Sequence, residues 1–399
     1  MKLKALAAIV ASLIVSVPAY GGQYENLTDL SLECESAILV DVDGGNVLYE
    51  HNSSEKLPPA SITKIMTLLL VYEAERDGRI SFTDEVSVSS HAASMGGSQV
   101  YLEEGERQSV EELVKCVSIA SANDAAVALA EYIGGSEDGF VEMMNERAKE
   151  LGMEDTTFKN ACGLDGDGHL SSARDIAVMS AELLRNFPEI TEYTTTWQDS
   201  LTHSTRRGTS EFGLTNTNKL VKWYEGATGL KTGSTSEAKY CLSASAKRGD
   251  MELVAVIMAA PDNKSRFSEA MELLDYGFAN YATVTGAEKG DIIGEADVSK
   301  GTAESVELAV EDDIRATLPK GSAEPTLTVT VDELTAPVHK GDIVGKAVYE
   351  LDGKTLAEAE VSAAADVGRA SPADMFCRLI KLWCSSYGFG VTEAEHGGE

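Results

Sequence analysis

The sequence is poor in cysteine, histidine and positive charge, and each shortage excludes a class of protein. Its 399 residues include 6 cysteines and 6 histidines, without a CxxC pair or an HExxH motif. Metal-ligand spacing is therefore missing, and we expect no structural or catalytic zinc and no cofactor. With 65 acidic and 33 basic residues, the net charge is −32. Such a surface repels phosphate backbones, so we expect no nucleic-acid binding.

The length of the chain suits two domains, and its 43% hydrophobic residues suffice to bury a core. At the N-terminus two lysines precede an apolar stretch and then small residues. This pattern predicts a secretory signal peptide over residues 1–19, with a retained signal anchor as the alternative. Export permits disulfides, but in a chain of this size we favour cysteines as small buried hydrophobes over a disulfide framework.

The first half of the chain reads as a hairpin followed by helices. Residues 36–50 are two β-rich runs around Asp-Gly-Gly-Asn, which predicts a β-hairpin. Two prolines then stop the extended chain, and helical spacing follows. Residues 109–152 are helical in character, and a further helix is expected over 172–185, capped by Ser171 or Ser172.

The later part of the chain changes from helices to strands. The runs 229–249 and 251–260 predict adjacent strands, and 265–281 predicts a closing helix. If these strands join the early hairpin, the two ends of the domain meet in one sheet. The order strands, helices, strands, helix favours an α/β (α+β) domain with an antiparallel sheet flanked by helices, placed at residues 25–282.

Two further segments follow this domain. Residues 283–368 alternate apolar and polar side chains and repeat one phrase, KGDIIG and KGDIVG, which predicts a small all-β domain used as a spacer or for interactions. In residues 372–390 the polar side chains share a narrow arc and apolar ones fill the rest. We expect an amphipathic helix in a membrane interface, with a helix packed on the β-rich domain as the alternative.

Acyl-transfer chemistry needs a nucleophile, a base and donors for the developing oxyanion. The sequence has no GxSxG motif, and its histidines have no suggestive context. A lysine of lowered pKa can replace histidine as the base. In Ser-Ile-Thr-Lys, Ser61 and Lys64 lie on one face of a helix, although this pattern alone is common.

Two more elements strengthen the pattern. Ser121-Ala-Asn123 follows downstream, and Lys231-Thr232-Gly233 opens a predicted strand. S-x-x-K, S-x-N and K-T-G in this order form the signature of penicillin-binding proteins and class A β-lactamases. Three weak patterns in the right order and context make a coincidence improbable.

In these motifs, and in PPASITKIMT, GGSQVYLEEGE and GLKTGSTSEAKYCLSASA, the chain resembles the low-molecular-mass penicillin-binding proteins. These are serine-type D-Ala-D-Ala carboxypeptidases, and the likeness covers roughly residues 25–385. The resemblance implies the serine β-lactamase/DD-peptidase-like transpeptidase fold and a membrane-anchoring tail at the outer face of the cytoplasmic membrane. It also implies removal of the terminal D-alanine from peptidoglycan stem pentapeptides, with β-lactams as covalent inhibitors.

The resemblance assigns roles to the motif residues. Ser61 would attack the carbonyl between the two D-alanines, and Lys64 would take its proton. Ser121 would relay a proton to the leaving D-alanine, while Asn123 would hold the peptide amide and Lys64.

The resemblance also implies a carboxylate site. Lys231 would depress the pKa of Lys64 and, with Thr232, receive the terminal carboxylate. Arg266 matches a carboxylate-binding position, with a helix-surface cation as the alternative.

The oxyanion hole would combine the backbone N–H of Ser61 with that of Ser234, and Gly233 would let the strand approach. Two residues depart from the family pattern. Ser234 stands where some members have histidine, and Lys239 where many have glycine.

Three alternatives remain open at this point. A serine β-lactamase shares the motifs, but the E-x-x-L-N phrase of class A is missing, and Glu142-x-x-Asn145 comes too early. DD-endopeptidase activity on cross-links would use the same site. A non-catalytic wall-binding scaffold would be expected to have lost some of these residues.

Overall fold

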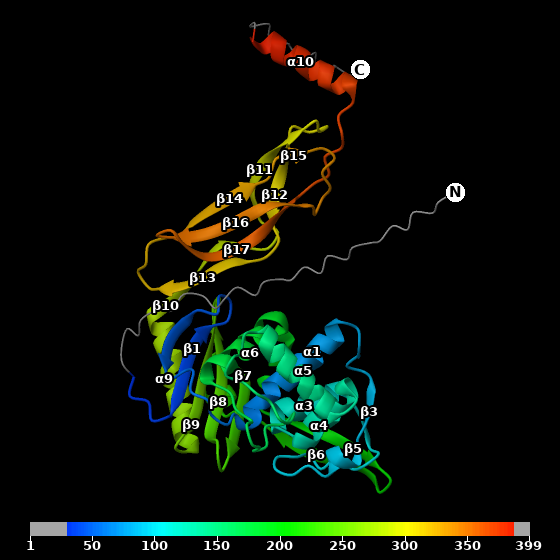
Figure 1. Cartoon of the computed structure of the whole chain (residues 1–399), viewed down its shortest axis with the longest axis vertical. Helices are drawn as coiled ribbons and strands as arrows, with labels where there is room; N and C mark the ends of the chain where they lie inside the picture. Colours follow the sequence, from blue (N-terminus) through cyan, green and yellow to red (C-terminus); the bar gives the residue numbers. More distant parts are fainter. Residues whose placement is uncertain (1–29, 387–399) are drawn as a thin grey trace, which may run out of the picture. The chain divides into compact units, whose positions relative to one another are not determined.

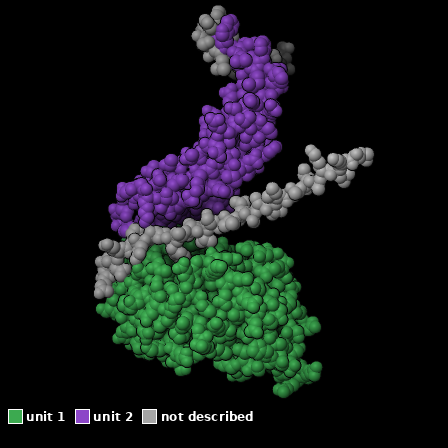
Figure 2. All heavy atoms as spheres, viewed as in Figure 1, with its two compact units in different colours: residues 1–280 green, residues 281–399 purple. Residues whose placement is uncertain are grey.

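The computed structural model describes residues 30–386, and its contacts divide the chain into two compact units (Figure 2). The first unit is residues 1–280 and the second is residues 281–399. The signal peptide predicted for residues 1–19 lies outside the described residues. Each unit has a hydrophobic core of its own, and each is described by itself.

A five-stranded antiparallel sheet forms the centre of the first unit, in the order β2-β1-β9-β8-β7 (Figure 1). The early hairpin and the later strands therefore share one sheet, as the sequence predicts. The run 229–249 forms a hairpin, because the chain reverses between Thr235 and Lys239. The strands are β1 (Ser36–Asp41), β2 (Val47–His51), β7 (Ala227–Thr235), β8 (Lys239–Arg248) and β9 (Met251–Ala260).

Both faces of the sheet are covered, and strand β1 shows how. All six of its residues are buried. Ile38 and Val40 belong to the main core, whereas Leu39 faces Gly277 of helix α9 (Asn263–Asn280), where a Cβ would lie 2.9 Å from the leucine. Helix α6 (Ala173–Asn186) also packs on β1 and β9. Cover on both faces explains why this strand reads as a continuous apolar run instead of alternating.

The expected helical stretch 109–152 forms three helices, α3, α4 and α5, because left-handed residues break it twice, at Ser121 with φ of +60° and at Gly135 with φ of +74°. Helix α6 begins after Ser172, whose Oγ accepts a hydrogen bond from the N–H of Asp175, as the capping pattern predicts. The longer helices are α1 (Lys64–Arg76), α3 (Val110–Ala120), α4 (Asn123–Gly134), α5 (Glu137–Glu150), α6 (Ala173–Asn186) and α9 (Asn263–Asn280).

Smaller elements complete the first unit. Two antiparallel strand pairs stand outside the main sheet, β3 (Glu85–Ser87) with β4 (Arg107–Ser109), and the hairpin of β5 (Gln198–Thr205) and β6 (Gly208–Thr215). The sequence did not predict them. The short helices are η1 (Ala60–Thr63), α2 (Ser90–Ala93), η2 (Pro188–Ile190), α7 (Thr191–Thr194) and α8 (Leu220–Trp223).

The second unit is built from strands, as the alternating pattern predicts. Its main sheet has the order β14-β16-β17-β12-β11-β15, and β10 pairs with β13. The strands are β10 (Tyr281–Ala287), β11 (Ile292–Ser299), β12 (Ser305–Val310), β13 (Ile314–Pro319), β14 (Thr326–Val331), β15 (Leu334–Thr335), β16 (Ile343–Leu351) and β17 (Lys354–Ala363).

The repeated KGDI phrase forms the same turn twice in this unit. Gly290 and Gly341 both have φ of +87°, which favours glycine. The N–H of Gly290 donates to the carbonyl of Val310, and that of Gly341 to the carbonyl of Ala363. In both places, the turn that precedes a strand (β11 or β16) is hydrogen-bonded to the last residue of another strand (β12 or β17).

Helix α10 (Pro372–Ser386) ends the described chain. Arg378 donates to the carbonyl of Thr302, but Met375, Phe376, Leu379, Ile380 and Trp383 are exposed. Phe376 and Leu379 are each 63% exposed and Trp383 is 66% exposed. Between residues 30 and 386, no helix combines the length and apolar character needed to cross a membrane.

Candidate active site

Ser61 lies in η1, which runs directly into α1. Ala60, just before it, has φ of +50°, a left-handed conformation that is rare for a residue with a side chain. The turn brings the predicted nucleophile and the predicted base into contact, because Lys64 Nζ donates to Ser61 Oγ at 2.9 Å. Strain of this kind is often found where a reactive group must be held in one orientation.

Lys64 is fully buried and is held by two further acceptors. Its Nζ donates to Oδ1 of Asn123 and to the carbonyl oxygen of Cys162, both at 2.6 Å. Burial lowers the pKa of Lys64 to about 8. The sequence analysis expected repulsion from Lys231 to lower the pKa of Lys64, but burial is the main cause of the lowering.

Ser121 is paired with the second buried lysine. It ends α3 in the left-handed conformation, and Lys231 Nζ donates to its Oγ at 2.7 Å. Lys231 is 1% exposed, and its pKa is lowered well below the usual value, first by burial and then by the charge of Lys64. Each hydroxyl of the site therefore has its own lysine.

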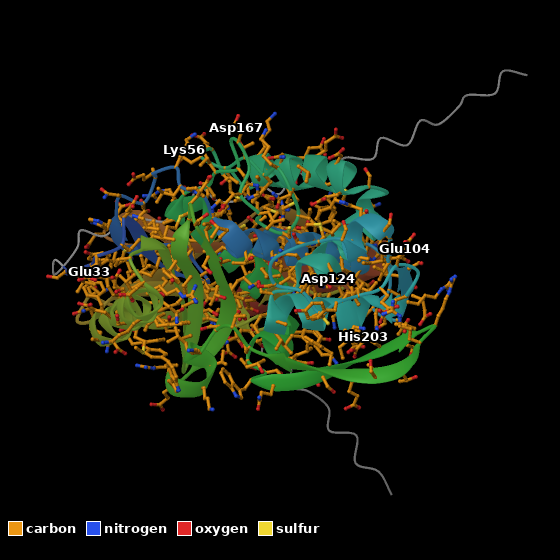
Figure 3. All side chains as sticks on the ribbon, turned by 90° about the horizontal axis from the view of Figure 1, so that it is seen from below. Glu33, Lys56, Glu104, Asp124, Asp167 and His203 are labelled. Carbon is orange, nitrogen blue, oxygen red and sulfur yellow. The ribbon has the colours of Figure 1, made fainter. Side chains whose placement is uncertain are left out.

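Asn123 and Asp124 fix the loop that precedes them in the sequence. Asn123 Nδ2 donates to the carbonyl of Gly96 at 2.6 Å. The buried carboxylate of Asp124, which lies among the helices in Figure 3, accepts the N–H groups of Val100 and Leu102. The sequence did not single out Asp124, although it follows the S-A-N motif directly.

Strand β7 carries the K-T-G motif past the turn that holds Ala60 and Ser61. Thr232 Oγ1 donates to Thr217 Oγ1 at 2.7 Å, a partner that the sequence did not suggest. At Gly233 a Cβ would lie 3.0 Å from the backbone nitrogen of Ser61, so only glycine lets the strand approach this closely. Ser234 follows on the strand and is exposed.

Arg266 lies in α9 and is only 7% exposed, so it is not a helix-surface cation. Its Nη1 donates to the carbonyl oxygens of Gly233 at 2.9 Å and of Cys241 at 3.3 Å. These two residues are paired across β7 and β8. Burial lowers the pKa of Arg266 to about 10. In this structure the guanidinium holds the end of the K-T-G strand.

Sequence reasoning missed the loop that completes the site. Asn160 Oδ1 accepts the N–H groups of Cys162 and Gly163, which forms a tight turn. Gly163 has φ of +83°, and a Cβ there would lie 1.9 Å from the carbonyl oxygen of Ala60. Asn-Ala-Cys-Gly is a recognisable turn sequence. Its contact with Lys64, 98 residues away, leaves no local signal.

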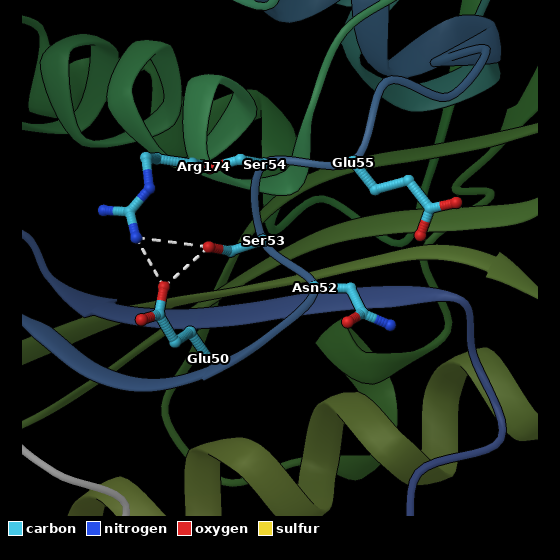
Figure 4. A pocket seen from close by; sticks show the side chains of 6 residues that line it. All are labelled: Glu50, Asn52, Ser53, Ser54, Glu55 and Arg174. Carbon is cyan, nitrogen blue, oxygen red and sulfur yellow. Dashed lines mark hydrogen bonds and ion pairs between the residues drawn. The ribbon is translucent and has the colours of Figure 1, made fainter.

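A separate open pocket of about 590 Å³ lies elsewhere on the first unit (Figure 4). Arg174 contacts Glu50 and Ser53 there, and none of the predicted site residues lines it.

Within the described residues, no three His, Cys, Asp or Glu side chains are grouped to hold a metal. Five cysteines are free: Cys34, Cys116, Cys162 and Cys241 are buried, and Cys377 is exposed.

Comparison with known proteins identifies the family. Residues 23–262 match the D-alanyl-D-alanine carboxypeptidase family. The chain belongs to this family. Residues 281–369 of the carboxypeptidase match the C-terminal domain of penicillin-binding protein 5. It is 44% identical to D-alanyl-D-alanine carboxypeptidase DacF of Bacillus subtilis (strain 168), over 89% of this chain and 91% of the relative.

Solved structures agree with this assignment. Penicillin-binding protein 5 from Haemophilus influenzae is 35% identical, with a TM-score of 0.70, and the match covers 86% of this carboxypeptidase and all of that chain. Penicillin-binding protein D2 from Listeria monocytogenes, solved in an ampicillin-bound form, is 33% identical, with a TM-score of 0.55. That match covers 63% of this chain and 100% of the Listeria chain. The predicted family, fold class and serine carboxypeptidase activity are confirmed.

Proposed function

We propose that the carboxypeptidase removes the terminal D-alanine of peptidoglycan stem pentapeptides through an acyl-enzyme on Ser61, with Lys64 as the general base. The observation that carries this proposal is the 2.9 Å contact between Lys64 Nζ and Ser61 Oγ. Because burial lowers the pKa of Lys64 to about 8, a useful fraction of the amine is neutral near pH 7. The proton of Ser61 passes to this amine as its oxygen bonds the carbonyl carbon.

Ser121 and Lys231 complete the proton path in this proposal. The leaving D-alanine needs a proton on its nitrogen, and Ser121 Oγ supplies it. The 2.7 Å contact with Lys231 supports this role, because the lysine stabilises the oxygen while the proton leaves. Asn123 keeps Lys64 in place through its Oδ1 and lies beside the bound peptide amide.

Lys231 and Thr232 receive the terminal carboxylate of the substrate in the proposed complex. The two residues are adjacent on β7 and come from the motif that passes the catalytic turn. Arg266 adds positive potential to the same end of the site, and its bond to the carbonyl of Gly233 favours an indirect role through the strand.

The proposed oxyanion hole is formed by the backbone N–H groups of Ser61 and Ser234. The close approach at Gly233 supports it, because it brings β7 beside the nitrogen of Ser61. Removing one such donor costs about 3–4 kcal/mol in the transition state.

β-Lactams are proposed to form a long-lived adduct on Ser61. The sequence lacks the E-x-x-L-N phrase that positions the deacylating water in class A β-lactamases. Acylation therefore proceeds as with substrate, while hydrolysis of the penicilloyl ester is slow.

Mass spectrometry with site mapping tests the proposal, after incubation with benzylpenicillin or diacetyl-Lys-D-Ala-D-Ala. We expect the adduct on Ser61, release of D-alanine from the peptide, and loss of both in Ser61→Ala. The exposed Ser54→Ala is the matched control and should behave as the unmodified chain. An adduct on another residue, or rapid hydrolysis of benzylpenicillin, would contradict the proposal.

We further propose that the protein is exported by residues 1–19 and acts at the outer face of the cytoplasmic membrane. Residues 25–282 would be the catalytic domain, 283–368 the β-rich domain and 372–390 the membrane-binding segment. The exposed apolar side chains of α10 support the last assignment. Sedimentation with lipid vesicles should carry down the chain from residue 20 onward, but not the same chain ending at residue 371.

A further inference from the structure

His169 makes a two-sided contact that the catalytic roles above do not use. Its ring is buried, at 3% exposure, in the loop before α6. Nδ1 accepts the backbone N–H of Lys159 at 2.9 Å, and Nε2 lies 2.9 Å from Thr63 Oγ1. Since a backbone N–H only donates, Nδ1 carries no proton, and the proton of the neutral ring is on Nε2. The ring therefore donates to Thr63.

Thr63 stands in the chain between the proposed nucleophile and its base. The same loop makes two further contacts with α1: Lys64 Nζ donates to the carbonyl of Cys162, and Thr67 Oγ1 donates to the carbonyl of Ala161, each at 2.6 Å. Contacts at Thr63, Lys64 and Thr67 follow one side of the helix, since residues three and four apart are neighbours there. The loop is thus attached along one turn, with the catalytic lysine in the middle.

We propose that His169 is a positioning residue, which bridges Lys159 and Thr63 and thereby holds the Cys162 carbonyl against the amine of Lys64. The inference rests on the proposed function, because it takes Lys64 as the base. When the bridge is broken, the loop loosens, the carbonyl moves away and water reaches Lys64. A displacement of about 1 Å in a catalytic group is enough to slow a reaction by a large factor.

Electrostatics agree with this arrangement. Burial lowers the pKa of His169 to about 4, with Asp165 and Lys159 as the nearby charged groups, so the ring is neutral in the working pH range. A protonated ring would set two donors, its own N–H and that of Lys159, against each other. Around Lys64, Cys162 of the loop and Asp124 of α4 raise its pKa against the effect of burial, and the charge of Lys64 in turn lowers the pKa of Lys231 on β7.

Two substitutions break the bridge from opposite sides. His169→Asn keeps an acceptor for the N–H of Lys159 but loses the donor to Thr63. Thr63→Val keeps the shape of Thr63 and removes the acceptor. We measure the rate of acylation by a fluorescent penicillin between pH 5.5 and 9.5, on folded protein quantified by its thermal transition. For both variants we expect the rate to fall about tenfold and its acidic limb to move to higher pH, as Lys64 gains water.

Thr63→Ser keeps the hydroxyl and should restore the profile, and the exposed His339→Asn in the second unit should leave it unchanged. A role in stability alone would lower the melting temperature without moving the acidic limb. The inference is overturned if His169→Asn and Thr63→Val are both labelled at the unmodified rate with the unmodified profile. If labelling does not depend on Ser61 at all, the proposed function fails instead.

Discussion

In the proposed mechanism, the protonation state of one amine, that of Lys64, sets the pH range in which the site works. Its folded pKa is about 8, lowered from 10.5, and only the neutral amine accepts the proton of Ser61. Below pH 8 the neutral fraction falls about tenfold per pH unit, so the acylation rate should rise with that slope and level off above pH 8. Stopped-flow acylation by a β-lactam measures this curve.

Two variants check that the curve belongs to Lys64. In Lys64→Arg the guanidinium keeps its proton at every accessible pH, and we expect a loss of about a thousandfold. Lys56→Arg, at an exposed position, should leave the curve unchanged. A flat profile in the unmodified chain would refute the assignment of Lys64 as the base.

Gly163 is required by space as well as by backbone conformation. Its φ is +83°, and a Cβ would lie 1.9 Å from the carbonyl oxygen of Ala60. Gly152 has a similar φ of +72° with open space around it, so it isolates the conformational cost. We expect Gly152→Ala to lower the free energy of unfolding by about 1 kcal/mol and Gly163→Ala by about 3 kcal/mol or more.

Urea unfolding gives both free energies, and penicillin labelling gives the effect on the site. Gly163→Ala should also slow acylation, because the displaced loop and the turn at Ala60 carry Cys162 and Ser61. Equal free-energy losses in the two variants would show that the close approach to Ala60 is not a constraint.

At the scale of helices and strands, capping gives a measurable contribution without touching the chemistry. Ser172 caps α6 through a 3.2 Å bond from the N–H of Asp175. We expect Ser172→Ala to lower the free energy of unfolding by about 1 kcal/mol, while acylation proceeds at the unmodified rate. Ser172→Asp, another good cap, should recover most of the loss. A loss of acylation in Ser172→Ala would mean that α6 has a part in the site.

The elements that sequence predicts well are those with a strong local pattern. The early hairpin has its turn sequence, and α6 has its cap. The β5–β6 hairpin lacks a strong apolar pattern, because only Leu201 and His203 are buried among the eight residues of β5. An exposed strand of polar residues resembles a loop. The helical stretch 109–152 looked continuous, because the left-handed turn at Ser121 falls on a residue type that helices also accept.

In the candidate active site, sequence reasoning likewise misses the contacts between residues that lie far apart in the chain. Ser61, Lys64, Ser121 and Lys231 lie in motifs whose order and spacing carry the information. The Cys162 carbonyl is a backbone atom that any residue would provide, 98 residues from Lys64. His169 lies 106 residues from Thr63. Such contacts depend on the folded path of the chain, so no single stretch of sequence reveals them.

At the scale of the whole molecule, net charge and the apolar tail would act in opposite directions on the proposed membrane binding. The net charge of −32 repels an anionic lipid surface, whereas α10 offers exposed Phe376, Leu379 and Trp383 for burial in the interface. The tail helix has two cations, Arg378 and Lys381, too few to reverse the sign. Attachment to membranes should therefore depend on apolar contact.

This balance predicts an unusual response to salt. For the chain from residue 20 onward, binding to anionic vesicles should strengthen as salt rises from about 0.01 M to 1 M, since the Debye length shrinks from about 30 Å to 3 Å and the repulsion is screened. Binding to zwitterionic vesicles should change little. Leu379→Glu should abolish both, because it places a charge on the apolar face. Binding that weakens with salt would mean instead that basic residues provide the attraction, and the apolar face of α10 would then not be the anchor.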